Sequence, residues 1–301
     1  MIKTKKKNNF GNSGVRRLTP YRVFCLVVLV LLAIAFTFPL YWIITGAFKT
    51  QQSINSVNPD WVPKEFVLTN FQKLLSRQKA PLFGEVGPMV PAAIRWLLNT
   101  VFMAVAAMIL TCFTATMAGY ALAKKRFRGA VVLFSLIVAA MALPKQVILI
   151  PLLREMSALH LYNKIWAVVL PTVGWPFGVF LMKQFSEAIP NELLEAARID
   201  GANEWSTFAT IVFPIVKPGV GALAIFTFIN SWNDYFMQLI MLSSTNKLTI
   251  SLGIAKLQAE NATDFGLIMA GATLAAVPIL AVFLAFQKYF TQGITMGAVK
   301  G

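Results

Sequence analysis

The sequence WLLNTVFMAVAAMILTCFTATMAGYALA, residues 96–123, contains no charged side chain, and KKRFR follows it directly at residues 124–128. A helix of about 20 apolar residues crosses the hydrocarbon core of a bilayer. Helix is the conformation that suits such a run, because lipid offers the backbone no hydrogen-bond partners. The stretch therefore predicts a transmembrane helix that ends in a strongly basic loop.

The rest of the chain has the same character. Of its 301 residues, 57% are hydrophobic and only 13% are charged, which is too few charges to cover a soluble domain of this length. The first apolar run is too long for the core of a signal peptide, so we interpret it as a retained span. We predict an all-α integral membrane protein with six transmembrane helices, at Val23–Phe48, Trp96–Ala123, Ala130–Leu153, Ile165–Met182, Gly219–Leu242 and Phe265–Gln287.

Lysine and arginine predict how these spans are oriented. The N-terminal segment is basic and contains no acid, and with six spans it lies on the same face as the loop at 124–128. The positive-inside rule makes that face cytoplasmic, which gives an N-in/C-in topology. The net charge of +15 is then largely topological, and no nucleic-acid partner is predicted. We expect a basic cytoplasmic segment 1–22, a membrane domain 23–287 with an external loop 49–95 and a cytoplasmic loop 183–218, and a cytoplasmic tail 288–301.

The cytoplasmic loop differs from its neighbours because acids outnumber bases in it. Its acids are Glu187, Glu192, Glu195, Asp200 and Glu204, and its bases are Lys183, Arg198 and Lys217. Pro190 suits the first position of a helix over Asn191–Ile199, and Gly201 lies where a helix end needs a left-handed residue. Asn203 then caps a second helix, Glu204–Ile211, which Pro214 and Pro218 end. The residues alone leave two interpretations open, a knob that docks a soluble partner or an ordinary interfacial loop.

A resemblance to a known family bears on this choice. Glu195-Ala196-Ala197-x-x-x-Gly201, followed by Ile211-x-Phe213-Pro214, resembles the EAA loop of ATP-binding cassette (ABC) importer permeases. Ser231-Trp232-Asn233-Asp234-Tyr235 and the ending from Gly293 to Gly301 are similar to the carbohydrate-uptake, maltose-type branch, and to its second, shorter permease. The resemblance implies that the loop between spans four and five couples to an ATPase through Glu195, Ala196, Ala197, Asp200, Gly201 and Pro214. It also implies that the C-terminal tail, with Gly297, Lys300 and Gly301, reaches the ATPase.

The resemblance also implies the partners of the chain. They are a homologous second permease, two ABC ATPase subunits and an extracytoplasmic binding protein that delivers a sugar, in a bacterial cytoplasmic membrane. The sequence contains no Gly-x4-Gly-Lys-Ser/Thr phosphate loop, so we expect ATP and Mg²⁺ on the separate ATPase and no cofactor on this chain. One histidine, His160, and two separated cysteines predict no metal site. We expect a non-catalytic permease subunit.

Polar residues inside the predicted spans are candidates for the substrate path, because polar groups in a membrane are expensive. The candidates are Asn230, Trp232, Asn233, Asp234 and Lys145, and a purely structural role, tying span five to its neighbours, stays open for them. The residues do not define which sugar is carried. Lys145 and Asp234 are also the coupling pair that the alternative function, an ion-coupled secondary transporter of small polar solutes, would use.

Overall fold

The computed structural model describes residues 19–58, 60–82 and 87–298, with side chains up to position 287. In this part of the chain the regular structure is helical apart from one antiparallel pair, β1 (Lys79–Pro81) and β2 (Met89–Pro91). Five helical segments are long and apolar enough to cross a membrane, and a bent helix pair makes a sixth when it is counted as one span. The predicted tail residues Lys300 and Gly301 and most of the segment 1–22 lie outside the described residues.

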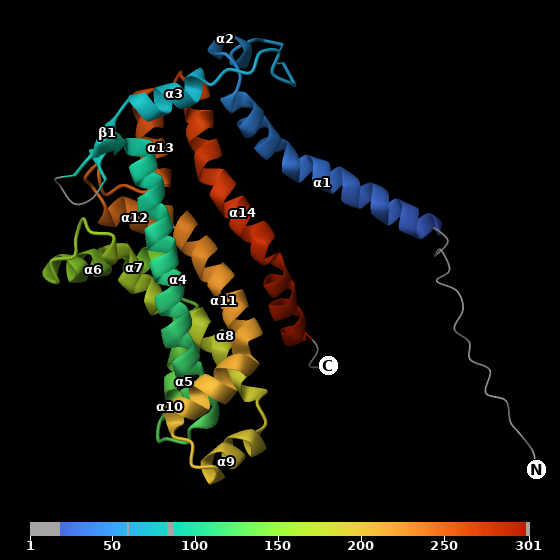
Figure 1. The fold of residues 1–301 in the computed structure, drawn as a ribbon, viewed down its shortest axis with the longest axis vertical. Helices are drawn as coiled ribbons and strands as arrows, with labels where there is room; N and C mark the ends of the chain where they lie inside the picture. The colour runs from blue at the N-terminus through green and yellow to red at the C-terminus, as the bar shows by residue number, and fades with distance from the viewer. Residues whose placement is uncertain (1–18, 59, 83–86, 299–301) are drawn as a thin grey trace, which may run out of the picture.

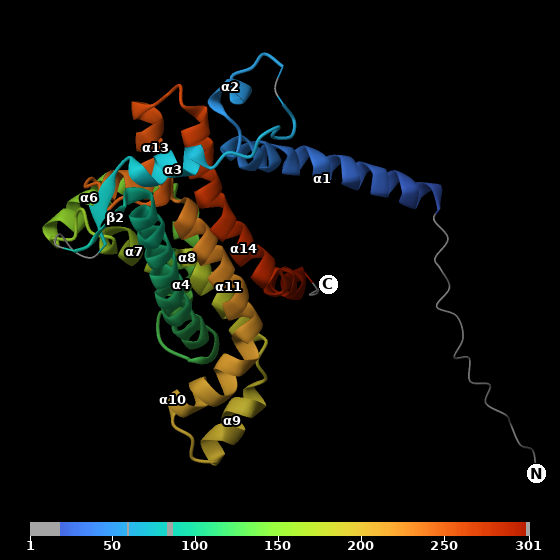
Figure 2. The ribbon, with the colours of Figure 1, turned by 45° about the horizontal axis from the view of Figure 1, so that its top comes forward.

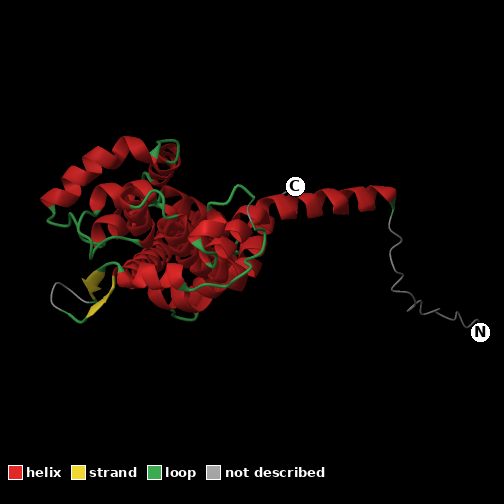
Figure 3. Ribbon diagram, turned by 90° about the horizontal axis from the view of Figure 1, so that it is seen from above, coloured by secondary structure: helices red, strands yellow, loops and turns green. Residues whose placement is uncertain are grey.

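The first span stands away from the others. Helix α1 (Pro20–Ala47) leaves the bundle at its C-terminal end and extends to one side, as Figures 1 and 3 show. Only its last two residues, Gly46 and Ala47, are buried. Gly46 lies directly against Met269, since a Cβ atom at position 46 would come within 2.2 Å of Met269 Sδ. The predicted first span is therefore present, but it is attached to this chain at one end only.

The central bundle is built on α4 (Ala92–Lys124), which packs against α7 (Trp166–Val173), α8 (Pro176–Glu187) and α11 (Phe213–Asn233). Figures 1 and 2 both show α4 and α11 side by side, with α14 (Phe265–Ala298) on the outer side of α11. Helix α4 approaches α8 through Gly119, where a Cβ atom would lie 2.6 Å from backbone atoms of Met182 and Lys183. Small residues permit such close approach, and in lipid this packing is a main source of helix association.

The third span, predicted over Ala130–Leu153, is a bent pair of helices in the structure. The helix ends at Ala140, and α5 (Ala130–Ala140) and α6 (Lys145–Ala158) meet at an angle of 106°. Pro144 explains the break, because it has no N–H to continue α5 and occupies the extended N-cap position of α6.

The fourth and fifth spans also differ from the prediction. The fourth, expected at Ile165–Met182, reaches Glu187 and is interrupted between α7 and α8 at Gly174 and Trp175. The fifth was expected at Gly219–Leu242, but α11 ends at Asn233. Asp234 leaves the helical conformation with ψ of 69°, and α12 (Tyr235–Met241) follows as a separate helix.

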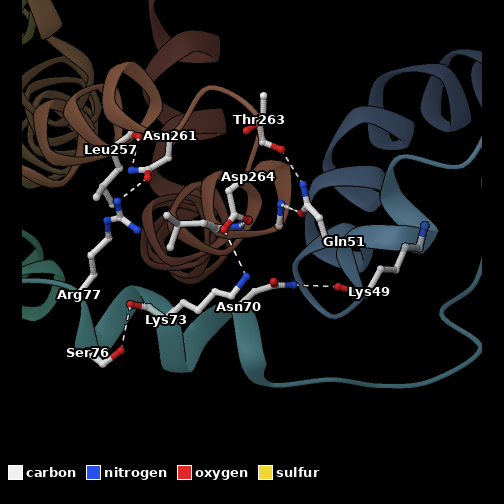
Figure 4. A network of polar contacts seen from close by, with 12 residues as sticks. Lys49, Gln51, Asn70, Lys73, Ser76, Arg77, Leu257, Asn261, Thr263 and Asp264 are labelled. Carbon is white, nitrogen blue, oxygen red and sulfur yellow. Dashed lines mark hydrogen bonds and ion pairs between the residues drawn. The ribbon is translucent and has the colours of Figure 1, made fainter.

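A polar cap covers the end of the bundle where α2 (Gln51–Ile54), α3 (Thr69–Ser76) and α13 (Ile250–Glu260) lie (Figure 1). Asn70 donates from Nδ2 to the carbonyl oxygens of Ala47 and Lys49, at 3.0 and 2.8 Å. Lys73 forms an ion pair with Asp264 at 3.2 Å. Figure 4 shows Asn70 bonded to Lys49, which follows α1, and Lys73 paired with Asp264, which precedes α14. The pairs Gln51–Thr263 and Arg77–Asn261 complete the network. The cap thus holds α1 at its attached end.

Candidate functional site

The acidic loop forms a helical knob at the end of the molecule opposite the cap (Figures 1 and 2). We call residues 190–207, which contain α9 (Asn191–Ile199) and α10 (Glu204–Thr207), the α9–α10 knob. Pro190 is the N-cap of α9 in extended conformation, one position earlier than predicted. Leu194 and Ala197 are buried, and Leu194 belongs to the apolar cluster that also contains Met182. The inner face of α9 therefore fixes the knob to the bundle.

The corner between the two helices follows the prediction. Gly201 has a φ of +79°, the left-handed conformation that glycine adopts without strain. The N–H of Ala202 donates to the carbonyl of Ala197 at 2.9 Å, and that of Gly201 to Arg198 at 3.1 Å, which together close a Schellman C-cap. Asn203 Oδ1 accepts a hydrogen bond from Ser206 N at 2.8 Å and caps α10. These bonds make the corner a defined turn.

The tip of the knob presents four of the predicted coupling residues. Glu195, Ala196, Asp200 and Gly201 are exposed, whereas the predicted Ala197 faces inward. Ile199, which lies between Arg198 and Asp200, is 85% exposed. Its apolar side chain is therefore left largely uncovered by the described residues. Ile199 was not among the predicted coupling residues, although a large apolar residue between Arg198 and Asp200 is a signal of such a contact. The tip combines acids, small residues and one large apolar side chain, which suits a protein partner.

Two lysines of the basic loop hold the knob in place. Lys124 Nζ donates to the carbonyl oxygens of Ile189 at 2.6 Å and Glu187 at 3.3 Å, and to Asn191 Oδ1 at 3.0 Å. It thereby caps the C-terminal end of α8 and reaches the first residue of α9. Lys125 forms an ion pair with Glu204 on α10. These lysines were predicted as topological charges alone, and their role in fixing the knob was missed.

The second helix of the knob continues into the membrane, which corrects the prediction that Pro214 and Pro218 end it. After α10 the chain forms a π-helical turn, η1 (Phe208–Val212), and passes directly into α11. Phe213 N–H bonds to the carbonyl of Phe208, five residues back. Pro214 then occupies the first turn of α11, where its missing N–H is tolerated. Pro214 is therefore a part of the junction between knob and span.

At the other end of α11 the three helix breaks surround a cavity of about 440 Å³. We call this cavity the helix-break pocket. Lys145 at the start of α6 donates to Asp234 Oδ2 at 3.3 Å, and its Nζ lies 6.0 Å from the ring centre of Trp175. Lys145, Asp234, Trp175, Thr172, Phe177 and Met237 are among the residues that line the pocket. The volume is within the usual range for small-molecule sites.

The predicted path residues divide into two groups around this pocket. Lys145 and Asp234 line it, and Asn230 and Asn233 are exposed on α11 just before Asp234. Both asparagines donate to carbonyls of their own helix, four residues back. Trp232 is only 2% exposed and packs against Phe228 in the core, so it is not part of the pocket. The aromatic side chains that line the pocket are Trp175 and Phe177, which sequence reasoning missed because only the helix break brings them there.

The fold is known from a solved transporter. It is shared with a chain of "a bacterial ABC transporter involved in the import of the acidic polysaccharide alginate", with a TM-score of 0.75 and 20% identity, covering 93% of this chain and 100% of that chain. The architecture is that of an ABC importer permease.

Sequence comparison defines the family. Residues 115–296 match the family of binding-protein-dependent transport system inner membrane components, and the chain belongs to it. It is 31% identical over 283 residues to the arabinooligosaccharides transport system permease protein AraQ of Bacillus subtilis, covering 93% of this chain and 96% of AraQ. It is also 31% identical over 273 residues to the lactose transport system permease protein LacG of Rhizobium radiobacter, covering 91% of this chain and 94% of LacG.

Proposed function

We propose that this chain is the membrane permease subunit of an ATP-driven sugar importer in a bacterial cytoplasmic membrane. Family membership and the oligosaccharide and lactose permeases among its relatives support this proposal. In the proposed orientation the N-terminus, the α9–α10 knob and the C-terminal tail are cytoplasmic, and the polar cap faces the binding protein. ATP and Mg²⁺ are then held by two separate ATPase subunits, and this chain has no catalytic residue and holds no cofactor. The chain takes the place of the second, shorter permease of a heterodimeric pair.

The observation that carries the proposal is the continuous helix from the knob to the pocket. The segment Glu204–Asn233 contains 30 residues, which at 1.5 Å per residue is a rod about 45 Å long. The rod begins in the knob and ends beside Asp234 in the helix-break pocket. When an ATPase displaces the knob, the rod moves the pocket wall that Asp234 belongs to. Nucleotide-driven motion is thereby converted into opening and closing of a cavity within the membrane.

The exposed groups of the knob tip are the ATPase contact in this proposal. Glu195, Ala196, Asp200 and Gly201 form the docking surface, Ala197 packs behind them, and Pro214 lies at the junction with the rod. Gly297, Lys300 and Gly301 extend the contact from the tail. The uncovered apolar side chains of α1 offer the second permease a surface within the membrane.

Co-purification tests the coupling surface. The tagged chain is purified in mild detergent from its host membranes, and the proteins that accompany it are identified by mass spectrometry and assayed for ATP hydrolysis. We expect a second permease and a protein with a phosphate loop. The double variant Glu195→Lys with Asp200→Lys should lose the phosphate-loop protein and keep the second permease. Glu260→Lys, an exposed acid at the end of α13 on the cap side, is the matched control and should keep both. The proposal fails if wild type brings down no ATPase, or if the double variant retains it.

We further propose that the helix-break pocket belongs to the sugar path, with Lys145, Asp234, Asn230 and Asn233 as hydrogen-bonding groups and Trp175 as an aromatic face. The charge-swapped variant, Lys145→Asp with Asp234→Lys, distinguishes this role from a structural one. The swap restores a structural ion pair. It does not restore the binding of a sugar that forms hydrogen bonds to each group in a fixed orientation. We expect uptake in proteoliposomes of the complete transporter to stay below a tenth of wild type. Full recovery would show that the pair is structural, and ion-driven uptake by the lone chain would favour a secondary transporter.

A further inference from the structure

Two hollows follow one another along the outer side of α4, away from the helix-break pocket. The first has a volume of about 320 Å³ and lies between α4 and α11, with Ile109, Phe113 and Val220 in its wall. The second has a volume of about 460 Å³ and lies between the end of α4 and α10, with Trp205 in its wall. Phe208, the first residue of the π-helical turn, lines both. We call the two together the α4–η1 groove.

The groove is apolar in the membrane and becomes polar toward the knob. In the first hollow the hydroxyl of Thr116 already donates to the carbonyl of Cys112 at 2.5 Å, so the wall offers no free polar group there. The wall of the second hollow includes Lys125, Glu204 and Tyr120. The hydroxyl of Tyr120 is buried and has no hydrogen-bond partner among the described residues.

The mouth of the second hollow is cationic. Lys125, the residue after α4, lines the hollow and pairs with Glu204, which also lies 3.6 Å from Arg198. Arg126 and Arg128 follow and are exposed, and no ion pair joins either to an acid within the described part of the chain. Lys125 lines the hollow, and the two arginines follow it by one and three residues in the chain. Guanidinium groups bind phosphate oxygens in a bidentate manner, so this segment can supply a phosphate site beside an apolar site for a lipid tail.

The dimensions suit one lipid. From Met108 to Lys125 the groove follows α4 for about 25 Å at 1.5 Å per residue. One leaflet contributes about 15 Å of hydrocarbon, so the groove spans an acyl chain and continues to the level of the headgroup. Trp205 is 58% exposed and stacks on Phe208 at 5.8 Å, as aromatic side chains do at a membrane interface.

We propose that the α4–η1 groove binds one anionic phospholipid of the cytoplasmic leaflet. An acyl chain occupies the hollow beside Val220, and the headgroup phosphate lies between Arg126, Arg128 and Lys125. The lipid rests against Phe208 in the π-helical turn, which is the junction between the knob and the membrane-spanning part of the rod. The lipid therefore stiffens this junction. The anionic lipid content of the membrane then tunes how strongly a movement of the knob is transmitted to the pocket wall. Only the orientation of the chain is taken from the proposed function, and the lipid site does not depend on sugar transport.

Lipid retention in native mass spectrometry tests the site. The transporter is purified as the assembly that the tagged chain brings down, and is then titrated with phosphatidylglycerol or phosphatidylcholine. We expect one tightly retained phosphatidylglycerol, with binding weakened at least tenfold in Arg126→Gln with Arg128→Gln. The matched control, Arg154→Gln with Lys164→Gln, removes two exposed charges from the opposite side of the membrane and should bind as wild type does.

A second variant tests the tail site separately. Val220→Trp fills the first hollow and leaves the arginines unchanged, and it should also abolish retention. Assemblies that keep their partner subunits show that each variant is folded. The proposal is overturned if both variants retain phosphatidylglycerol, or if phosphatidylcholine is retained equally. It is also overturned if Phe113→Cys crosslinks to the second permease, because a protein then occupies the groove.

Discussion

The contact between α4 and α8 at Gly119 gives a prediction that can be worked from the structure. A Cβ atom at this position would lie 2.6 Å from Lys183 N and from the carbonyl carbon of Met182, whereas ordinary contact begins at 3.4 Å. In Gly119→Ala the two helices must therefore separate by about 0.8 Å, against backbone atoms that cannot rotate away. Overpacking of this kind costs about 1–3 kcal/mol. It also loosens α8 next to its end, where Lys124 connects it to the α9–α10 knob.

The assay is thermal unfolding of the purified chain in detergent, followed by size-exclusion chromatography. A change of 1 kcal/mol shifts Tm by about 2–4 °C in domains of 150–250 residues, so we expect Gly119→Ala to lower Tm by roughly 2–12 °C. The matched control is Gly174→Ala, where the nearest atom to a new Cβ is the Pro171 carbonyl oxygen at 3.8 Å. An unchanged Tm for Gly119→Ala, or an equal loss in both variants, would refute the argument that close helix approach holds the bundle together.

Three further predictions concern the knob and the cap. Gly201→Val should cost about 1–2 kcal/mol and raise hydrogen exchange in the knob, because its φ of +79° strains a β-branched residue although no atom lies within 4 Å of the new Cβ. Gly201→Asn should be close to wild type, and equal effects of the two would count against this cause. Lys124→Met should cost about 1–3 kcal/mol, measured by Tm, by removing the charged donor of three hydrogen bonds, whereas Lys125→Met should cost less than about 1 kcal/mol. Hydrogen bonds from Lys64 and Ser53 lower the pKa of Asp60, so its stabilisation is complete above the ordinary carboxyl pKa and is lost as pH falls through the lowered value. Hydrogen exchange at residues 50–58 should then show reduced protection in acid, where protection is measured against the exchange rate of an unfolded peptide at the same pH. Asp60→Asn should remove this dependence of protection on pH.

Features set by local sequence could be predicted, and features set by contacts between spans could not. Gly201 and Asn203 act through their own backbone neighbours, so the corner of the knob could be predicted residue by residue. Hydropathy located the first and last spans because their apolar runs are unbroken in the sequence.

The helix breaks show where such reasoning stops. Pro39 and Pro278 lie inside continuous helices, whereas Pro144 stands between two helices that meet at 106°. A proline is compatible with a continuous helix and with a helix break, and packing against the neighbouring spans determines which of the two forms. The helix-break pocket depends on that decision, which is why Asp234 and Lys145 could be proposed as candidates and Trp175 could not.

The attachment of α1 at one end has a consequence for how the transporter is put together. Hydrocarbon tails solvate apolar side chains as well as a protein surface does, so a helix that stands apart in the bilayer carries no hydrophobic penalty. A newly inserted subunit can therefore persist on its own, with its first helix extended, and needs no holding factor to shield it. If the proposed second permease docks there, docking requires only diffusion in the plane of the membrane and no refolding, and the measured Tm then depends on the concentration of both chains.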